Sequence, residues 1–464
     1  MSSQRSFTLR LLLAAVLAGV LAALPAFAAD KPVSYYHDLT PILKRSCTGC
    51  HHPGKLKGEL DLTTYAAFAK GGKHGVSFKP GAPKNSSVID EISGDEPSMP
   101  KEGDPLSKAE VALFVRWIVE GAKDDTPANA NSFKLTEPPT YTRPPVISAL
   151  AFSPDGRQLA VSGYHEVLVH KAGESNILAR LVGESPRIES IAYAPNGKLI
   201  GVSGGAPALF GEIQLWSTES NVMVRSIKSS IDSLYGLSFS PDSERVAVGG
   251  ADKSVRVFSV QSGKELMKFD NHSDWVFSTT FLTDGQRLLS GSRDKAMKLI
   301  NVANGQFIDD INKLLEGALC LARHPKEDLV VYGGEQGVSR IYRVAENQGR
   351  TAANNDVNLI KEYERLGGPV QAIAWSPDAK HIAVGGAAAE VRLYTAGKDG
   401  RRVATLQGHE GAVFSVAFSP TTNWLAVGGF DGTLRLYDYA APSNQLVRSF
   451  FPVPLKSGAQ TASK

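Results

Sequence analysis

The segment SCTGCHHPG, residues 46–54, contains two of the three cysteines of the chain, and a histidine directly follows the second of them. Cys47 and Cys50 are three positions apart, and His51 is the next residue. Such a triplet serves as a redox dithiol, as part of a zinc site, or as the attachment point of a c-type haem. The rest of the sequence has to distinguish these three chemistries.

The zinc and dithiol interpretations lack the partners that they require. A zinc site needs four ligands, and no second Cys-x-x-Cys pair exists to supply them. A redox dithiol is expected near a βαβ pattern, which is absent from the sequence. The motif therefore favours one covalent haem c, attached through Cys47 and Cys50, with His51 as an axial iron ligand. Cys320, in an apolar run, is expected to be an inert core thiol.

The spacing of the motif suits this chemistry. Residues three positions apart on a helix share one side, so both sulfurs can reach the two vinyl groups along one haem edge. The imidazole of His51 then points towards the iron. We expect a short helix in the preceding DLTPILKRSC, with Thr40 as its cap and Pro41 at its first position.

A second axial ligand must come from elsewhere, because otherwise the iron stays open for chemistry. Met99, in DEPSMPKEG, is the only methionine between residues 29 and 124. The flanking prolines favour an extended loop, and a methionine in so polar a loop is a poor core residue. Met99 is therefore the predicted ligand. His74 is the rival, and His37 is a more remote alternative.

A second helix is predicted behind this loop. Ser107 and Glu110 form a capping box, and Gly121 stands where a glycine would end the helix. Between them, apolar residues recur at helical spacing: Leu113, Phe114, Trp117 and Ile118. This apolar stripe is expected to pack against the first helix and to shield the porphyrin from water.

Residues from about 35 to 122 resemble the planctomycete-type cytochrome c domain. DLTPIL, CTGCH, KGELDL, KGG, PG, MP and LSKAEVALFVRWIVEGA follow one another in the order of that family. The resemblance implies a small all-α haem domain, placed at residues 29–124, with His51 and Met99 as the axial pair. Lys101 is a departure, since such domains often have MPP at this point.

The N-terminus has the pattern of an export signal. Arg5 and Arg10 precede the apolar run Leu11–Leu24, and a small-x-small pattern ends at Ala28. The run is short for a membrane span. We expect residues 1–28 to be removed and the mature protein to be periplasmic or otherwise exported, without a stable membrane span. An uncleaved anchor is the alternative. Bacteria attach haem to this motif outside the cytoplasmic membrane, so motif and signal support each other.

Residues 125–144 are rich in Pro, Thr, Asn and Asp and are predicted to form a linker. Beyond it the chain repeats itself at a period of roughly 41 to 52 residues, which is typical of four-stranded propeller blades. ISALAFSPDGRQLAVSG and VFSVAFSPTTNWLAVGG are two of seven such copies. Each copy predicts two strands around a Pro-Asp-Gly type of turn, followed by two further strands.

These copies resemble the WD-repeat family. GHEGAVFSVAFSPTTNWLAVGGFDGTLRLYD carries His409 and Asp431 at the family's structural positions, while only Trp216 keeps the eponymous tryptophan. The resemblance implies an all-β, seven-bladed propeller over residues 145–452, followed by a flexible tail at 453–464. The fold class expected for the whole chain is therefore multidomain.

The propeller has no nucleophile elbow, phosphate loop or zinc signature. Asp252, Asp294 and Asp431 recur at the same place in their repeats and are expected to stabilise turns. The propeller is thus predicted to dock redox partner proteins and other proteins. A net charge of +3 with intermixed signs argues against a nucleic-acid partner.

These observations together predict an exported electron-transfer and interaction protein rather than an enzyme. One alternative is a binding or scaffold protein of the cell envelope, in which the propeller is the functional part and the haem is structural or sensory. Another is a peroxidase-like enzyme or gas sensor, in which the iron has lost Met99.

Overall fold

The computed structural model describes residues 31–52, 55–101, 103–127, 137–312, 315–345, 356–440 and 445–456. The predicted signal peptide, residues 1–28, and most of the predicted tail lie outside these ranges. The chain divides into two compact units, residues 1–127 and 128–464. None of the helices described is both long and apolar enough to cross a membrane.

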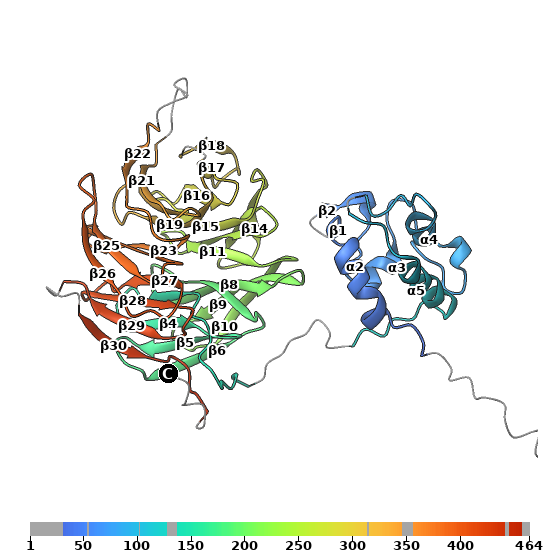
Figure 1. The fold of residues 1–464 in the computed structure, drawn as a ribbon, viewed down its shortest axis with the longest axis horizontal. Helices are drawn as coiled ribbons and strands as arrows, with labels where there is room; N and C mark the ends of the chain where they lie inside the picture. The colour runs from blue at the N-terminus through green and yellow to red at the C-terminus, as the bar shows by residue number, and fades with distance from the viewer. Residues whose placement is uncertain are drawn as a thin grey trace, which may run out of the picture. The chain divides into compact units, whose positions relative to one another are not determined.

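The first unit is built mainly of short helices (Figure 1). Its elements are the π-helical turn η1 (Tyr35–Leu39), α2 (Thr40–Ser46), β1 (His51–His52), β2 (Lys55–Leu56), η2 (Lys57–Glu59), α3 (Tyr65–Lys70), η3 (Pro83–Asn85), α4 (Ser87–Ile92) and α5 (Lys108–Val119). The strands β1 and β2 pair antiparallel. Because of this short hairpin, the expectation of an all-α domain is not confirmed.

The helix before the cysteines begins earlier than predicted. The Ser34 hydroxyl accepts a hydrogen bond from His37 N at 2.8 Å, and η1 runs directly into α2. The predicted cap at Thr40 is therefore wrong: its hydroxyl lies within the helix and donates to Tyr35 O at 3.0 Å. The reason is a competing cap, since Asp38 also accepts from Ser34 N at 2.8 Å.

Helix α5 has the capping chemistry that the sequence predicts. Glu110 N donates to the Ser107 hydroxyl at 3.3 Å, and Ser107 N donates to the Glu110 carboxylate at 2.8 Å. Gly121 follows the helix with φ of 101°, a conformation that glycine adopts without steric cost. The buried face of α5 consists of Phe114, Trp117 and Ile118.

The second unit consists of β-sheets around a common centre (Figure 1). In its described part, five sheets have four consecutive strands each. The first sheet contains β3 (Leu150–Phe152), β4 (Gln158–Ser162), β5 (Glu166–Lys171) and β6 (Ile177–Val182). The next contains β7 (Arg187–Tyr193), β8 (Leu199–Ala206), β9 (Phe210–Ser217) and β10 (Met223–Ser230).

Three further four-stranded sheets lie later in the chain. One contains β19 (Ala318–Arg323), β20 (Leu329–Gly334), β21 (Ser339–Arg343) and β22 (Leu359–Glu362). Another contains β23 (Val370–Trp375), β24 (His381–Gly386), β25 (Val391–Thr395) and β26 (Arg402–Leu406). The last contains β27 (Val413–Phe418), β28 (Trp424–Gly429), β29 (Leu434–Asp438) and β30 (Leu446–Phe450).

An eight-stranded sheet lies between β10 and β19 in the chain. Its strands are β11 (Leu234–Phe239), β12 (Arg245–Gly250), β13 (Val255–Ser259), β14 (Glu265–Phe269), β15 (Val276–Phe281), β16 (Arg287–Ser292), β17 (Met297–Asn301) and β18 (Phe307–Asp310). The inner strands β11 and β15 are joined in parallel where Gly236 lies opposite Ser278. A Cβ on Gly236 would come within 2.3 Å of Ser278 Cα, so glycine permits this close approach.

The first strand of each four-strand group faces the centre. Strands β3, β7, β11, β15, β19, β23 and β27 contact one another in this order, and β27 contacts β3. Each sheet buries one face on the preceding sheet and the other on the next. Val167 and Val169 pack with Ile188, whereas Leu159 packs with Ala426. The second unit is therefore a closed β-propeller.

Candidate functional site

The Cys-x-x-Cys-His segment continues the last turn of α2. Cys47 N donates to Leu43 O at 2.9 Å, and Cys47 O accepts from both Cys50 N at 3.1 Å and His51 N at 3.2 Å. These bonds wind residues 47–51 into one helical turn, which places the two thiols about one turn apart. Both cysteines are half-buried and take part in no disulfide.

The thiol of Cys47 has the properties of a buried group. Burial raises its pKa to about 11, and nearby Arg45 offsets only part of this effect. The thiol is therefore protonated at neutral pH, whereas redox-active cysteines have a lowered pKa. In the ranges that the structure describes, no three His, Cys, Asp or Glu side chains are grouped to hold a metal ion. Neither the dithiol nor the zinc interpretation gains support here.

His51 lies at the start of the β1–β2 hairpin. Its backbone is fixed, because its carbonyl accepts from Leu62 N at 3.0 Å and the residue pairs with Leu56. The ring nitrogen Nδ1 is buried and has no hydrogen-bond partner among the described residues. A buried polar atom without a partner is costly. The ring therefore fits a site in which a further group, such as a haem, completes its bonding.

Met99 packs against the same hydrophobic core as Cys47. It is half-buried, and Met99 N donates to Glu91 O at 2.9 Å, which ties its loop to α4. The rival ligands His74 and His37 are both exposed. The core thus joins Cys47 and Met99, while neither rival ring is buried in it.

An aromatic cluster forms the interior of this core. Its members are Tyr35, Tyr65, Phe68, Phe78 and Trp117. Their polar atoms are satisfied at the edge, since the Tyr65 hydroxyl donates to Ala122 O at 2.8 Å and Trp117 Nε1 donates to Lys123 O at 3.0 Å. The sequence indicated Trp117 but not its partners from other elements. The cluster thus gives an apolar, aromatic interior to the core against which Cys47 packs.

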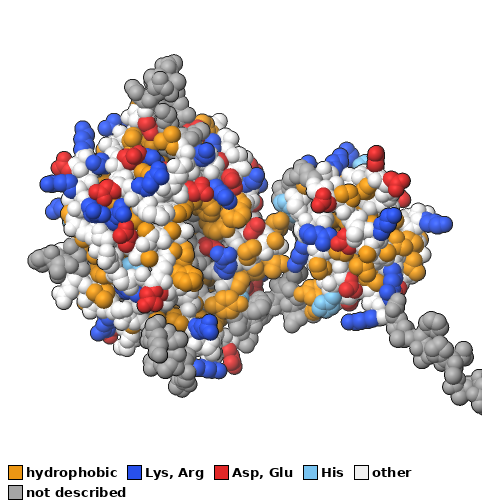
Figure 2. Space-filling view, viewed as in Figure 1, with side chains coloured by type: hydrophobic (Ala, Val, Ile, Leu, Met, Phe, Trp, Pro, Cys, Tyr) orange, Lys and Arg blue, Asp and Glu red, His pale blue; other side chains and the backbone are white. Residues whose placement is uncertain are grey.

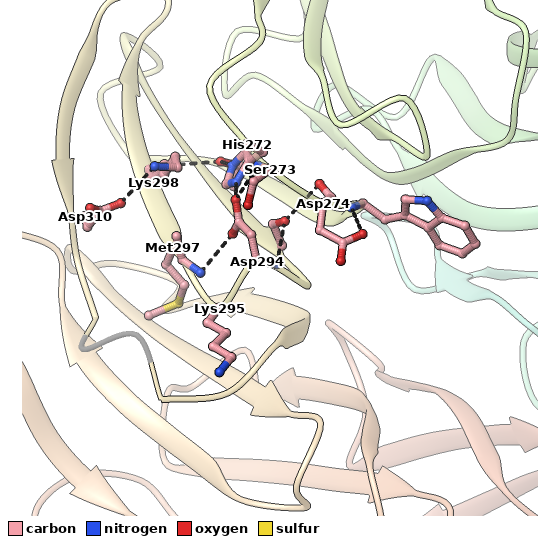
Figure 3. Close-up of polar contacts among 12 residues, drawn as sticks. His272, Ser273, Asp274, Asp294, Lys295, Met297, Lys298 and Asp310 are labelled. Carbon is pink, nitrogen blue, oxygen red and sulfur yellow. Dashed lines mark hydrogen bonds and ion pairs between the residues drawn. The ribbon is translucent and has the colours of Figure 1, made fainter. Parts of the chain in front are cut away.

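The recurring aspartates of the propeller stabilise turns, as predicted. Figure 3 shows His272 and Asp294 pointing towards each other, with Asp294 Oδ2 2.8 Å from His272 Nδ1. The other ring nitrogen of His272 lies 2.8 Å from the Ser290 hydroxyl. Burial raises the pKa of Asp294, but hydrogen bonds from His272, Ser273 and Ala296 outweigh it and lower the pKa to about 2. All these bonds join Asp294 to other residues of the propeller, so the carboxylate has a structural role.

The other two aspartates have the same role. Asp252 accepts from Ser254 N at 3.3 Å and pairs with Arg256 at 2.6 Å. Asp431 accepts from Thr433 N at 2.9 Å and pairs with Arg435 at 2.7 Å.

The centre of the propeller contains a cavity of about 1110 Å³. Apolar side chains that are exposed to solvent line it: Tyr164 is 51% exposed, Trp275 39% and Phe430 62%. Tyr235 stacks beside Trp275, with ring centroids 6.2 Å apart. We call Tyr164, Tyr235, Trp275 and Phe430 the rim. Sequence reasoning missed it because its members come from turns and strands of different repeats.

Charges are intermixed elsewhere on the propeller. On the face that Figure 2 shows, Lys and Arg side chains alternate with Asp and Glu over the part of the propeller that is described. Glu189, which also lines the cavity, lies 3.2 Å from Arg187 Nε, and burial raises its pKa. The rim therefore stands out by its exposed aromatic rings rather than by charge.

Comparison with known proteins agrees with these two units. The family model "Planctomycete cytochrome C" matches residues 47–103, and "WD domain, G-beta repeat" matches residues 222–259, 263–301 and 400–438. Protein groucho of Drosophila melanogaster is 22% identical over 274 residues, which cover 53% of this chain and 33% of that protein. The chain thus spans about a third of the length of this relative.

The class of the protein follows from the fold, the site and these matches. The chain joins a planctomycete cytochrome c domain to a propeller of WD repeats. A cytochrome c domain implies haem binding by the first unit, and WD repeats suggest protein interaction by the second.

Proposed function

We propose that this protein is an exported c-type cytochrome that transfers single electrons while its propeller docks partner proteins. The turn at residues 47–51 carries the proposal. It presents two half-buried thiols and an imidazole whose buried Nδ1 has no partner among the described residues, beside a core that contains Met99. When bound, a haem supplies a one-electron ferric–ferrous couple.

Each residue of the site has a distinct task in this proposal. Cys47 and Cys50 would hold the porphyrin through thioether bonds from their sulfurs. His51 and Met99 would be the two side chains that hold the iron. If both side chains bound the iron, no position would remain for a reagent, and the aromatic cluster would keep water away. These features suit electron transfer better than catalysis.

We further propose that the propeller has seven blades. The eight-stranded sheet then counts as two blades, β11–β14 and β15–β18, joined by the bridge between Gly236 and Ser278. The closed order of inner strands supports this count. Partner proteins dock at the rim, because exposed aromatic side chains around a cavity are typical of interaction sites.

The proposed location is the periplasm or another exported compartment. It rests on the basic and apolar pattern of residues 1–28 and on the place where bacteria attach haem to Cys-x-x-Cys-His. N-terminal sequencing of the secreted protein tests it, with Ala29 as the expected first residue.

Absorption spectroscopy and mass spectrometry of the purified full-length protein test the haem site. We expect the added mass of one haem and, in the ferric state, a charge-transfer band from thioether to iron. Met99→Ala should abolish this band and keep the added mass, whereas the matched control His74→Ala should keep both. A bare polypeptide would overturn the proposal. A high-spin wild-type spectrum that shifts with cyanide would favour an open-site enzyme instead.

A further inference from the structure

The propeller ring closes without a shared strand in its described part. The first sheet consists of β3–β6 and the last of β27–β30, each from consecutive segments. Flanking residues complete the seam between them. Ile147 N donates to Gly429 O at 3.0 Å, Tyr141 pairs in parallel with Leu455, and Lys456 N donates to Tyr141 O at 3.0 Å. These segments outside the sheets add contacts to the seam, beside the buried core that the first and last sheets share.

One face of β5 receives these segments. Glu166, Leu168 and His170 alternate along the strand and so point to the same side. The Tyr141 hydroxyl donates to Glu166 at 2.7 Å, and buried Leu168 packs with buried Val453. The ring of His170 meets that of Phe450 edge to face, with centroids 5.7 Å apart. We call residues 450–456 the clasp.

His170 is the titratable centre of this contact. It is 1% exposed, and neither ring nitrogen has a hydrogen-bond partner among the described residues. Burial lowers the pKa of His170, and the backbone groups of Ser175, Pro452 and Asn176 offset only part of the effect. An imidazolium is therefore disfavoured while the seam is closed.

The charged groups around the seam have other partners. On the same face of β5, Glu166 is held by Arg180 through bonds of 2.6 and 2.7 Å. Lys171, the next residue on β5, pairs with Glu174 at 2.6 Å. None of these side chains contributes to the pKa shift of His170. A proton on His170 would thus bring into the seam a positive charge that no carboxylate balances.

We propose that the clasp is acid-sensitive: protonation of His170 releases the clasp from β5, while the first and last sheets stay joined through their shared buried core. A released clasp lets water reach the imidazole of His170, where its protonated form is stable. The clasp therefore detaches more often as the pH falls below about 6.5, the ordinary pKa of histidine.

Hydrogen exchange of the full-length holoprotein, read by mass spectrometry at pH 7.5 and pH 5.5, tests this inference. After correction for the intrinsic exchange rate, exchange in β5 and the clasp should rise at pH 5.5, by at most about tenfold. Strands β19–β22, which do not adjoin the seam, should not show this rise. His170→Phe, which keeps a ring of similar size but cannot take up a proton, should abolish it.

His381→Phe is the matched control. His381 is in β24 and faces Tyr439, which follows β29, with ring centroids 5.6 Å apart. The His381 side chain is only half-buried. This variant should keep the acid response of the clasp. His170→Gln serves as a second uncharged variant in case His170→Phe misfolds. An unchanged response in either His170 variant, or no local rise in the wild type, would overturn the proposal.

Discussion

The rings of Phe68 and Trp117 are stacked, 11° from parallel and with centroids 6.1 Å apart. This contact joins α3 to α5 in the interior of the haem domain. Both side chains are at most 1% exposed. The stack therefore connects the two helices across the core that Cys47 and Met99 also touch.

Removing one ring of this stack should destabilise the haem domain. Trp117→Ala leaves a large cavity and should lower the free energy of unfolding of this unit by about 3–5 kcal/mol. Urea unfolding followed by haem absorbance measures the change. Val119→Ala, at a position on the same helix that is 58% exposed, should cost less than about 1 kcal/mol. Equal effects of the two variants would contradict the packing described for α5.

Loss of the two cysteines should affect one unit only. Each unit has its own core, so calorimetry of the full-length protein should show two transitions. Cys47→Ala/Cys50→Ala should remove the covalent haem and shift the transition of the haem domain to lower temperature. The propeller transition should keep its midpoint, and a common shift of both would show that the units unfold as one.

The joint between β11 and β15 should not tolerate a side chain. Gly236→Ala places a Cβ 2.3 Å from Ser278 Cα, so the inner strands must move apart. Gly197→Ala is the control, since Gly197 also has a positive φ, of 73°, but no atom within 4 Å of the added Cβ. The control should cost about 1–2 kcal/mol from backbone strain alone. Gly236→Ala should cost more, and thermal unfolding of the propeller compares the two variants.

The propeller should lose stability in strong acid through Asp294. Its pKa is lowered to about 2 from an ordinary value of 3.8, so its contribution to stability is complete above pH 3.8 and is lost as the pH falls through 2. Urea midpoints between pH 5 and pH 2 should therefore fall more steeply in the wild type than in Asp294→Asn. Asp270→Asn, at an aspartate whose side chain is 62% exposed, should follow the wild type.

Local chemistry explains which parts could be predicted from the sequence. The capping box of Ser107 and Glu110 needs only residues within one turn, and it was predicted correctly. The cap at Thr40 was not, because Ser34 and Asp38 form an earlier one that competes for the same helix. A rule that considers one candidate cap at a time cannot detect such competition.

Long-range proximity explains what could not be predicted. The cysteine motif lies within five consecutive residues and could be identified from spacing alone. The rim could not be identified, because Tyr164 and Phe430 are far apart in the sequence. They line the same cavity only once the propeller has closed. The sequence repeats predict that a propeller forms. They do not predict the rim, because the turn residues that face the centre differ from one copy to the next.

This arrangement of the rim has a consequence for biogenesis. Tyr164 lies near the start of the propeller and Phe430 near its end, yet both border one cavity. A chain that is still being synthesised, or one cut short before its final repeat, presents only part of the proposed docking surface. A partner that requires the complete surface can then recognise only finished molecules, which makes association itself a check on completion.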